Sequence, residues 1–248
     1  MEERVDIRVA VRERYGAIAE GKCGCGCGCS SDCCGDTATT GLAELGYSAE
    51  ETAAIPEGAN LGLGCGSPIS LAKPKGGETV LDLGSGAGVD AFLAAREVGP
   101  EGTVIGVDMT PAMIDRARAN AAKGGYANVE FRLGEIEHLP VPDASVDVIV
   151  SNCVVNLSPE KDRVFREAYR VLKSGGRMLV SDLVLEQPLP KETRESIEAY
   201  VGCIAGASLR GDYLQLMRDA GFREVEVVRE GRYGADPVTS VQVRAEKP

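Results

Sequence analysis

The stretch TVLDLGSGAG at residues 79–88 decides the fold. Its first five residues are apolar and β-branched apart from Asp82, a composition typical of a short buried strand. The glycines that follow allow a tight turn and a close approach of the backbone to a ligand. The run VDAFLAAREVG (89–99) is then typical of a helix, and TVIGVDM (103–109) of a second strand. The stretch therefore opens a strand–helix–strand unit.

The same alternation continues along the rest of the chain. Strands are expected at 79–83, 103–109, 128–134, 146–152, 177–185, 222–230 and 238–246. The last two alternate apolar and polar residues with period two, which predicts an antiparallel pair at one sheet edge. A helix opened by Ser158 and Pro159 should run to Lys173 and end at Gly175. These patterns predict an α/β fold with a doubly wound, mostly parallel seven-stranded sheet.

Residues 1–61 differ from this alternation. A helix is expected over residues 5–19, and a second short helix should begin at Ser48, where Glu51 completes a capping box. Between them lies KCGCGCGCSSDCCGD (22–36), in which glycine alternates with cysteine. We therefore expect a helical and cysteine-rich N-terminal segment over 1–61, followed by the α/β domain over 62–248.

Charge and composition exclude several classes of protein. The 248 residues carry a net charge of −11, which leaves no basic footprint for nucleic acid. The start MEERVDIRVA lacks the apolar core of a signal peptide, and no apolar run approaches the about 18 residues of a membrane span. Nine cysteines stand against one histidine, His138, for which we expect a surface loop. We expect a cytoplasmic monomer without nucleic-acid or membrane partners, in which sulfur performs any polar chemistry.

The glycine turn is paired with two carboxylates. Asp108 ends the second strand twenty residues after Gly88, where its carboxylate can accept both hydroxyls of a ribose. Asp82 precedes the turn and suits a ligand that carries an ammonium or sulfonium group, whereas it would repel a pyrophosphate. A dinucleotide-binding dehydrogenase would require GxGxxG rather than GxGxG, and a plain tight turn would leave Asp108 unexplained.

This combination resembles the class I S-adenosylmethionine methyltransferases, and the resemblance implies S-adenosylmethionine as cofactor. Asp82 would face its charged end, and Asn152 would position it. The other implied contacts are Gly84, Ser85 and Gly86 at the methionine moiety, Asp108 at the ribose, and Met109, Ile136 and Glu137 at the adenine.

Three cysteines stand alone at Cys65, Cys153 and Cys203. Cys153 follows the fourth strand, and ligands of open α/β sheets bind at the carboxyl ends of strands. Cys65 and Cys203 lie in segments that can fold over that cleft. Each alone could be a small buried apolar residue. Their wide spacing and the missing fourth ligand disfavour structural zinc, and three thiolates suit a soft, three-coordinate centre such as trivalent arsenic.

Around these cysteines the runs LGLGCGSP, SNCVVNL and YVGCIAGA are similar to the three cysteine motifs of arsenite methyltransferases. The resemblance covers residues 58–228. It implies that Cys65, Cys153 and Cys203 bind As(III) as thiolates and that the arsenic lone pair attacks the sulfonium methyl group. No general base is then needed, because this nucleophile carries no proton. The segment near 190–212 would form a lid on the methyltransferase domain.

The family uses protein thiols with thioredoxin or glutathione as reductants, and its substrates are arsenite or arsenite–thiol conjugates. Its members often carry one or two cysteines in the N-terminal region, which Cys33 and Cys34 match as a redox pair. The preceding Cys23, Cys25, Cys27 and Cys29 depart from that pattern and could capture metal or form a tail without a fixed role. Two alternatives stay open: a methyltransferase acting on another small molecule, and a thiol-based metalloid-binding protein.

Overall fold

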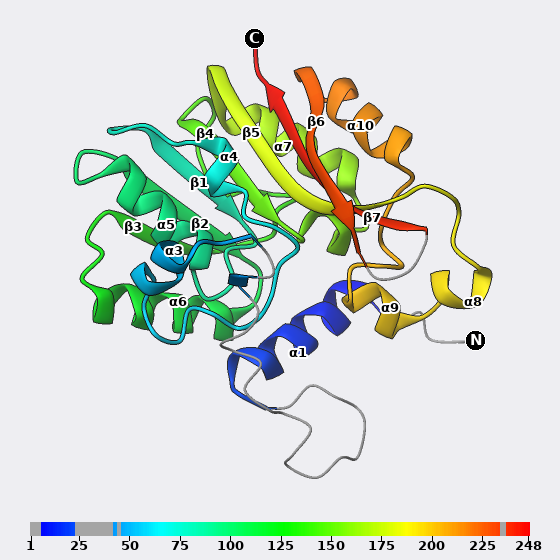
Figure 1. Cartoon of the computed structure of the whole chain (residues 1–248), viewed down its shortest axis with the longest axis horizontal. Helices are drawn as coiled ribbons and strands as arrows, with labels where there is room; N and C mark the ends of the chain where they lie inside the picture. The colour runs from blue at the N-terminus through cyan, green and yellow to red at the C-terminus, as the bar shows by residue number, and fades with distance from the viewer. Residues whose placement is uncertain (1–5, 23–41, 44–45, 234–236) are drawn as a thin grey trace.

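A seven-stranded sheet forms the centre of the computed structural model, which describes residues 6–22, 42–43, 46–233 and 237–248 (Figure 1). Its strands are β1 (Thr79–Leu83), β2 (Thr103–Asp108), β3 (Val129–Leu133), β4 (Val146–Asn152), β5 (Leu172–Leu185), β6 (Arg223–Arg232) and β7 (Val238–Glu246). They lie in the order β3-β2-β1-β4-β5-β7-β6. The first five are parallel, and β7 is antiparallel to both β5 and β6. The predicted sheet and its antiparallel edge pair are therefore confirmed.

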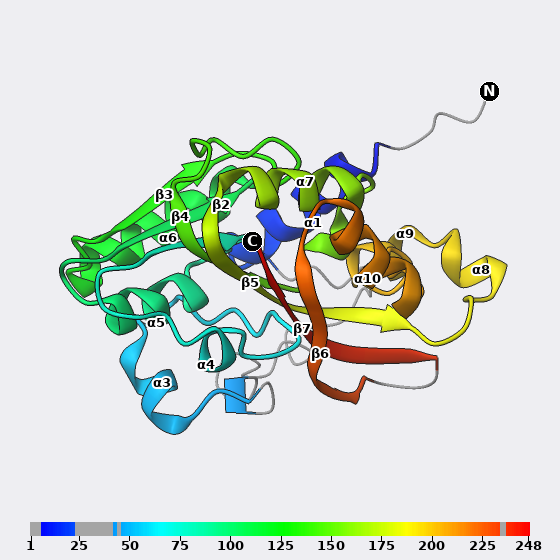
Figure 2. The same ribbon diagram turned by 90° about the horizontal axis from the view of Figure 1, so that it is seen from above.

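Helices cover both faces of the sheet, as Figure 2 shows for α5 on one side and α7 on the other. The helices are α1 (Ile7–Ala19), α3 (Ala49–Ala54), α4 (Ile69–Ala72), α5 (Val89–Val98), α6 (Pro111–Gly124), α7 (Lys161–Val171), α8 (Lys191–Arg194), α9 (Ile197–Val201) and α10 (Arg210–Asp219), with the 3-10 turn η2 (Val155–Leu157). One buried cluster packs α5 and α6 against the sheet, and another packs α7 and α10. The central strands β1 and β4 are buried on both sides, which explains their nearly continuous apolar sequences.

The boundary between α7 and β5 differs from the prediction. The helix begins at Lys161 rather than at Ser158 and ends at Val171, and β5 starts directly at Leu172. Gly175 does not end the helix; it lies within β5, where its N–H donates to the carbonyl of Lys247. The register of β4 against β5 shifts in this region, so the glycine belongs to an irregular stretch of strand.

The described part of the N-terminal segment packs onto the domain. The helix predicted over 5–19 is present as α1, and the predicted capping box of Ser48 and Glu51 is present at α3. Helix α1 contacts α6 and α9 and lies beside α9 in Figure 1. Its Val11 and Tyr15 join a third apolar cluster, which contains all three predicted site cysteines. The segment therefore contributes to the site.

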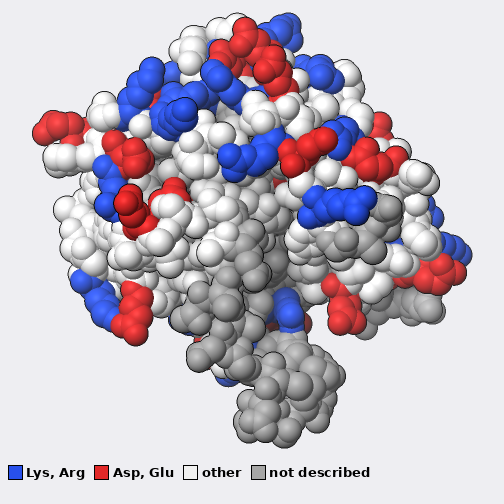
Figure 3. Space-filling model, in the orientation of Figure 1, with Lys and Arg blue, Asp and Glu red and all other residues white. Residues whose placement is uncertain are grey.

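Charged side chains of both signs are interspersed on the face drawn in Figure 3. The structure also contains direct ion pairs, as between Arg210 and Glu230 at 2.7 Å. Among the residues that the structure describes, no helix is long and apolar enough to cross a membrane.

Candidate active site

A cavity of about 300 Å³ lies where the parallel strands end. It brings together residues that the sequence analysis selected from five separate segments. Those lining it are Asp82, Gly84, Ser85, Gly86, Asp108, Met109, Ile136, Glu137, Asn152, Cys153 and Cys203. Cys65 lies beside it, since its neighbour Gly64 is part of the wall. The order of the sheet reverses between β1 and β4, and such a switch point is where open α/β sheets bind ligands.

The glycine turn is held against the end of β2. The N–H of Gly86 donates to Asp108 Oδ2 at 3.0 Å, and the N–H of Thr110 donates to Asp108 Oδ1 at 2.8 Å. A carboxylate has about four acceptor positions, so Asp108 can still accept from a hydroxyl group. Gly84 has φ +66°, and a Cβ there would lie 2.4 Å from the Val154 side chain, so only glycine fits. The turn and Asp108 thus form one rigid wall.

Asp82 leaves a buried acceptor facing the cavity. Its side chain is 2% exposed, and its Oδ2 has no hydrogen-bond partner among the described residues. Burial, followed by the charges of Asp90 and Asp108, raises the pKa of Asp82 well above its usual range. A buried acceptor without a partner is costly, and an ammonium group would satisfy it. The residues present therefore fit the cationic methionine end of S-adenosylmethionine.

Two further residues that were not predicted also line the cavity, Asp90 and Tyr47. Asp90 is buried at the start of α5, and Tyr47 precedes α3 and is buried as well. The Tyr47 hydroxyl donates to Asp90 Oδ1 at 2.9 Å, and Asn152 Nδ2 donates to Asp90 Oδ2 at 3.0 Å. A carboxylate in the otherwise apolar first half of a helix, directly after a glycine turn, is the signal that could have identified Asp90.

The three predicted site cysteines converge. Cys65 and Cys153 are joined by a disulfide bond, with their Cα atoms 5.8 Å apart. Cys203 is a buried free thiol whose Sγ donates to the carbonyl of Cys153 at 3.1 Å. A carboxylate oxygen of Asp182 lies within 4.8 Å of the sulfur atoms of Cys65 and Cys153. The structure therefore contains the oxidised form of two of the three predicted ligands.

Two of these cysteines have strained backbones. Cys153 has φ 57° and Cys203 has φ 64°, the left-handed region that non-glycine residues rarely adopt. Such conformations persist only where the surroundings impose them, and they concentrate at functional sites. For Cys153 one constraint is its N–H, which donates to the carbonyl of Ser181 at 2.8 Å.

The Cys203 thiol has an unusual environment. Burial, followed by the charge of Asp182, raises its pKa to about 12. The hydroxyl of Tyr15 lies 4.0 Å from Cys203 Sγ and donates to the carbonyl of Val201 at 3.3 Å. At neutral pH Cys203 is therefore a protonated thiol.

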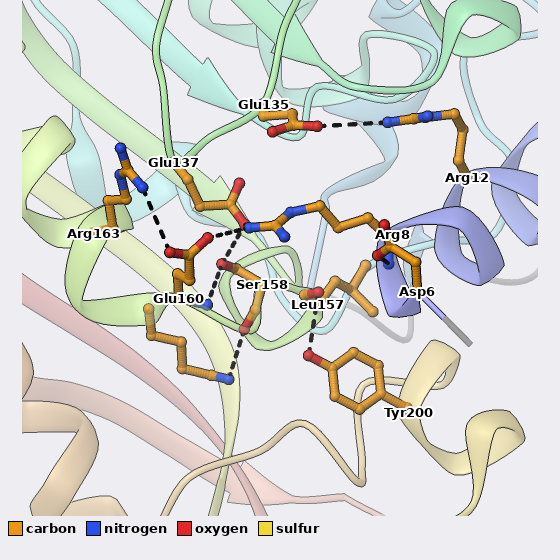
Figure 4. Close-up of polar contacts among 11 residues, drawn as sticks. Asp6, Arg8, Arg12, Glu135, Glu137, Leu157, Ser158, Glu160, Arg163 and Tyr200 are labelled. Carbon is orange, nitrogen blue, oxygen red and sulfur yellow. Dashed lines mark hydrogen bonds and ion pairs between the residues drawn. The ribbon is translucent and has the colours of Figure 1, made fainter. Parts of the chain in front are cut away.

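Glu137, a predicted adenine contact, is tied to the N-terminal helix (Figure 4). It is 3% exposed and accepts from Arg8 Nη2 at 3.2 Å and from Ser158 Oγ at 2.6 Å. Arg8 also pairs with Glu160, so its guanidinium lies between two carboxylates. These contacts anchor α1 over the Glu137 end of the cavity.

The remaining predicted residues divide into two groups. His138 is exposed in a loop, as predicted. Cys33 and Cys34, together with the alternating cysteines at 23–29, lie outside the described residues, and their roles stay predictions.

Comparisons with known proteins agree with this geometry. A family model described as a methyltransferase domain matches residues 74–221. An arsenite methyltransferase of Halobacterium salinarum is 54% identical over 229 residues, which cover 90% of this chain and 59% of that protein. The human arsenite methyltransferase is 39% identical over 152 residues, 58% of this chain and 40% of its own. The chain thus spans about half the length of the curated relatives it matches.

Among solved structures, an arsenic(III) S-adenosylmethionine methyltransferase of Chlamydomonas reinhardtii superposes with a TM-score of 0.69 at 35% identity, covering 85% of this chain and 73% of that one. The fold, the glycine turn and the family model define a class I methyltransferase that uses S-adenosylmethionine. Within that class, the chain belongs to the arsenite S-adenosylmethionine methyltransferase family.

Proposed function

We propose that this chain transfers methyl groups from S-adenosylmethionine to trivalent arsenic bound by Cys65, Cys153 and Cys203. The observation that carries the proposal is the convergence of these three isolated cysteines beside a cavity walled by Asp82 and Asp108. The relatives named for the same reaction support it.

The site residues divide the work between two ligands. Asp82 holds the cationic methionine end, Asp108 the ribose, and Ile136 the adenine. S-adenosylmethionine supplies an electrophilic methyl group when bound. The cysteines hold arsenic so that its lone pair faces that group, and the rate enhancement comes from positioning and from exclusion of water.

Arsenic loading requires the reduced protein. Two electrons from a thiol reductant convert the Cys65–Cys153 disulfide to two thiols, and the reductant becomes a disulfide in turn. Arsenous acid then condenses with three thiols, and each thiol proton leaves with a hydroxyl group as water. We propose thioredoxin or glutathione as reductant, the cytoplasm as compartment, the 190–212 segment as a lid, and a monomer.

The test incubates the full chain with S-adenosylmethionine, arsenite and a thiol reductant, and detects methylated arsenic by chromatography with elemental detection. Cys65→Ser, Cys153→Ser and Cys203→Ser should each abolish methylation and leave cofactor affinity, measured by calorimetry, unchanged. Asp108→Ala is the matched control, because it should weaken cofactor binding and leave arsenite binding intact. Full methylation of arsenite by all three serine variants would refute these cysteines as the arsenic ligands, and no methylated arsenic from the unaltered chain would favour another small molecule as substrate.

A further inference from the structure

The loop that carries Cys65 is enclosed between side chains of the sheet. A Cβ added at Gly64 would lie 3.0 Å from Asn152 Nδ2, and one added at Gly66 would lie 2.2 Å from Ser181 Oγ. The glycines on either side of Cys65 are therefore required because the two side chains approach the backbone so closely.

Hydrogen bonds fix the loop backbone on both sides of the cysteine. The N–H of Cys65 donates to Asn152 Oδ1 at 2.9 Å, and Asn152 Nδ2 donates to the carbonyl of Gly66 at 2.7 Å. From β7, the hydroxyl of Ser240 donates to the carbonyl of Cys65 at 2.9 Å. The Asn152 side chain therefore bonds to the backbone on both sides of the Cys65 side chain. Its oxygen accepts from the Cys65 N–H, and its nitrogen donates to the Gly66 carbonyl.

The orientation of the Asn152 amide is determined by its neighbours. Asp90 and the Tyr47 hydroxyl both lie beside Nδ2, at 3.0 and 2.9 Å. The Tyr47 proton is already donated to Asp90, and a carboxylate can only accept, so the amide nitrogen must face this pair. The amide oxygen is then left to face the N–H of Cys65.

Asn152 also directly precedes Cys153, the residue bonded to Cys65. Its backbone therefore carries one predicted arsenic ligand while its side chain holds the loop of another. We propose that Asn152 is a positioning residue that fixes Cys65 against Cys153, and that Asp90 and Tyr47 act through it by orienting its amide. This inference rests on the proposed function, and it assigns Asn152 to the arsenic ligands in place of the predicted cofactor contact.

The test uses the full chain with the six cysteines between residues 23 and 34 replaced by serine, so that only the site thiols remain. Two affinities are measured by calorimetry, for arsenite and for S-adenosylhomocysteine. Asn152→Ala should weaken arsenite binding about tenfold, the effect of losing one or two net hydrogen bonds, and change cofactor affinity less than about twofold. Tyr47→Phe, which keeps the buried ring, should weaken arsenite binding about threefold.

Asn128→Ala is the matched control. Asn128 also donates twice to backbone carbonyls, those of Ala95 and Gly99, but outside the site, so its replacement should leave both affinities unchanged. Weaker cofactor binding with unchanged arsenite binding in Asn152→Ala would overturn the inference and restore the cofactor role.

A second measurement needs no arsenic. The fraction of the Cys65–Cys153 disulfide is followed in glutathione buffers, where fixing the two residues together favours the bonded form. Asn152→Ala should shift this equilibrium about tenfold toward the dithiol, because it removes one or two hydrogen bonds that hold the two cysteines together. An unchanged equilibrium would contradict the positioning role. If Asn152→Ala shifts the disulfide equilibrium but the wild-type chain forms no methylated arsenic, only the proposed function is refuted.

Discussion

Asp182 lies buried in β5, close to the site cysteines, and its pKa links the site to the stability of the fold. Burial raises its pKa from 3.8 to about 7, against the opposing effect of hydrogen bonds from Leu183 and Tyr213. A pKa raised by folding gives a stability contribution that is complete below 3.8 and is lost as the pH rises through the folded value. Asp182 should therefore destabilise the disulfide-bonded, ligand-free protein increasingly between about pH 4 and pH 7.

Asp182→Asn should remove this dependence, because an amide can still accept from Leu183 and can donate to the Tyr213 oxygen. Urea denaturation should show the variant gaining stability over wild type, on the order of 3 kcal/mol, as the pH rises over that range. Asp147→Asn is the control of opposite sign. Burial acts to raise the pKa of Asp147, but bonds from Lys173 and Thr79 outweigh it and lower the pKa. Equal pH profiles for wild type and Asp182→Asn would show that the carboxyl is not the titrating group.

The role of helix α1 at the cavity follows from its contacts with distant residues and not from its own sequence. Arg8, Val11 and Tyr15 all line the cavity, and the ion pairs of Arg8 anchor the helix to Glu137. Arg8→Ala leaves a carboxylate that is 3% exposed without its cation. We expect it to loosen α1 and to weaken S-adenosylhomocysteine binding about fivefold, within the range for removing one partner of a partly buried pair.

Arg163→Ala is the matched control for Arg8→Ala. Arg163 pairs with the same Glu160, at 3.5 Å, but does not belong to the cavity wall. Calorimetry should find its cofactor affinity equal to that of wild type. If both variants lost affinity equally, the effect would belong to Glu160 and not to the anchoring of α1.

Elements set by local pattern could be predicted from the sequence, and those set by distant partners could not. The strands and the capping box of Ser48 depend on neighbouring residues, and they were predicted correctly apart from the start of β5. The end of α7 was wrong because Gly175 pairs with Lys247, at the other end of the chain. The bond between Arg8 and Glu137 could not be predicted either, because the two residues are 129 positions apart in the sequence. The site cysteines were selected by motif, but the strained backbones of Cys153 and Cys203 depend on the tertiary surroundings.

At the scale of the whole molecule, the proposed arsenic and cofactor sites share one wall. Tyr15 lines the cavity and also contacts Cys203, so a ligand that orders α1 against the cavity also orders the surroundings of that thiol. Met109, a predicted adenine contact, packs in the same apolar cluster as the three cysteines. Binding at either site should then favour binding at the other, and the coupling must be reciprocal.

Calorimetry should therefore find that saturating S-adenosylhomocysteine increases arsenite affinity by about fivefold, and that arsenite increases cofactor affinity by the same factor. Tyr15→Phe removes the hydroxyl that contacts Cys203 and Val201, and it should reduce the coupling while leaving each separate affinity near wild type. Tyr126→Phe is the control, because that hydroxyl donates to the carbonyl of Ala54 outside the cavity. If neither ligand changes the affinity for the other in the wild-type chain, the shared wall does not couple the two sites. Coupling retained in Tyr15→Phe would assign the transmission to the apolar cluster, because the ring of residue 15 stays in place there.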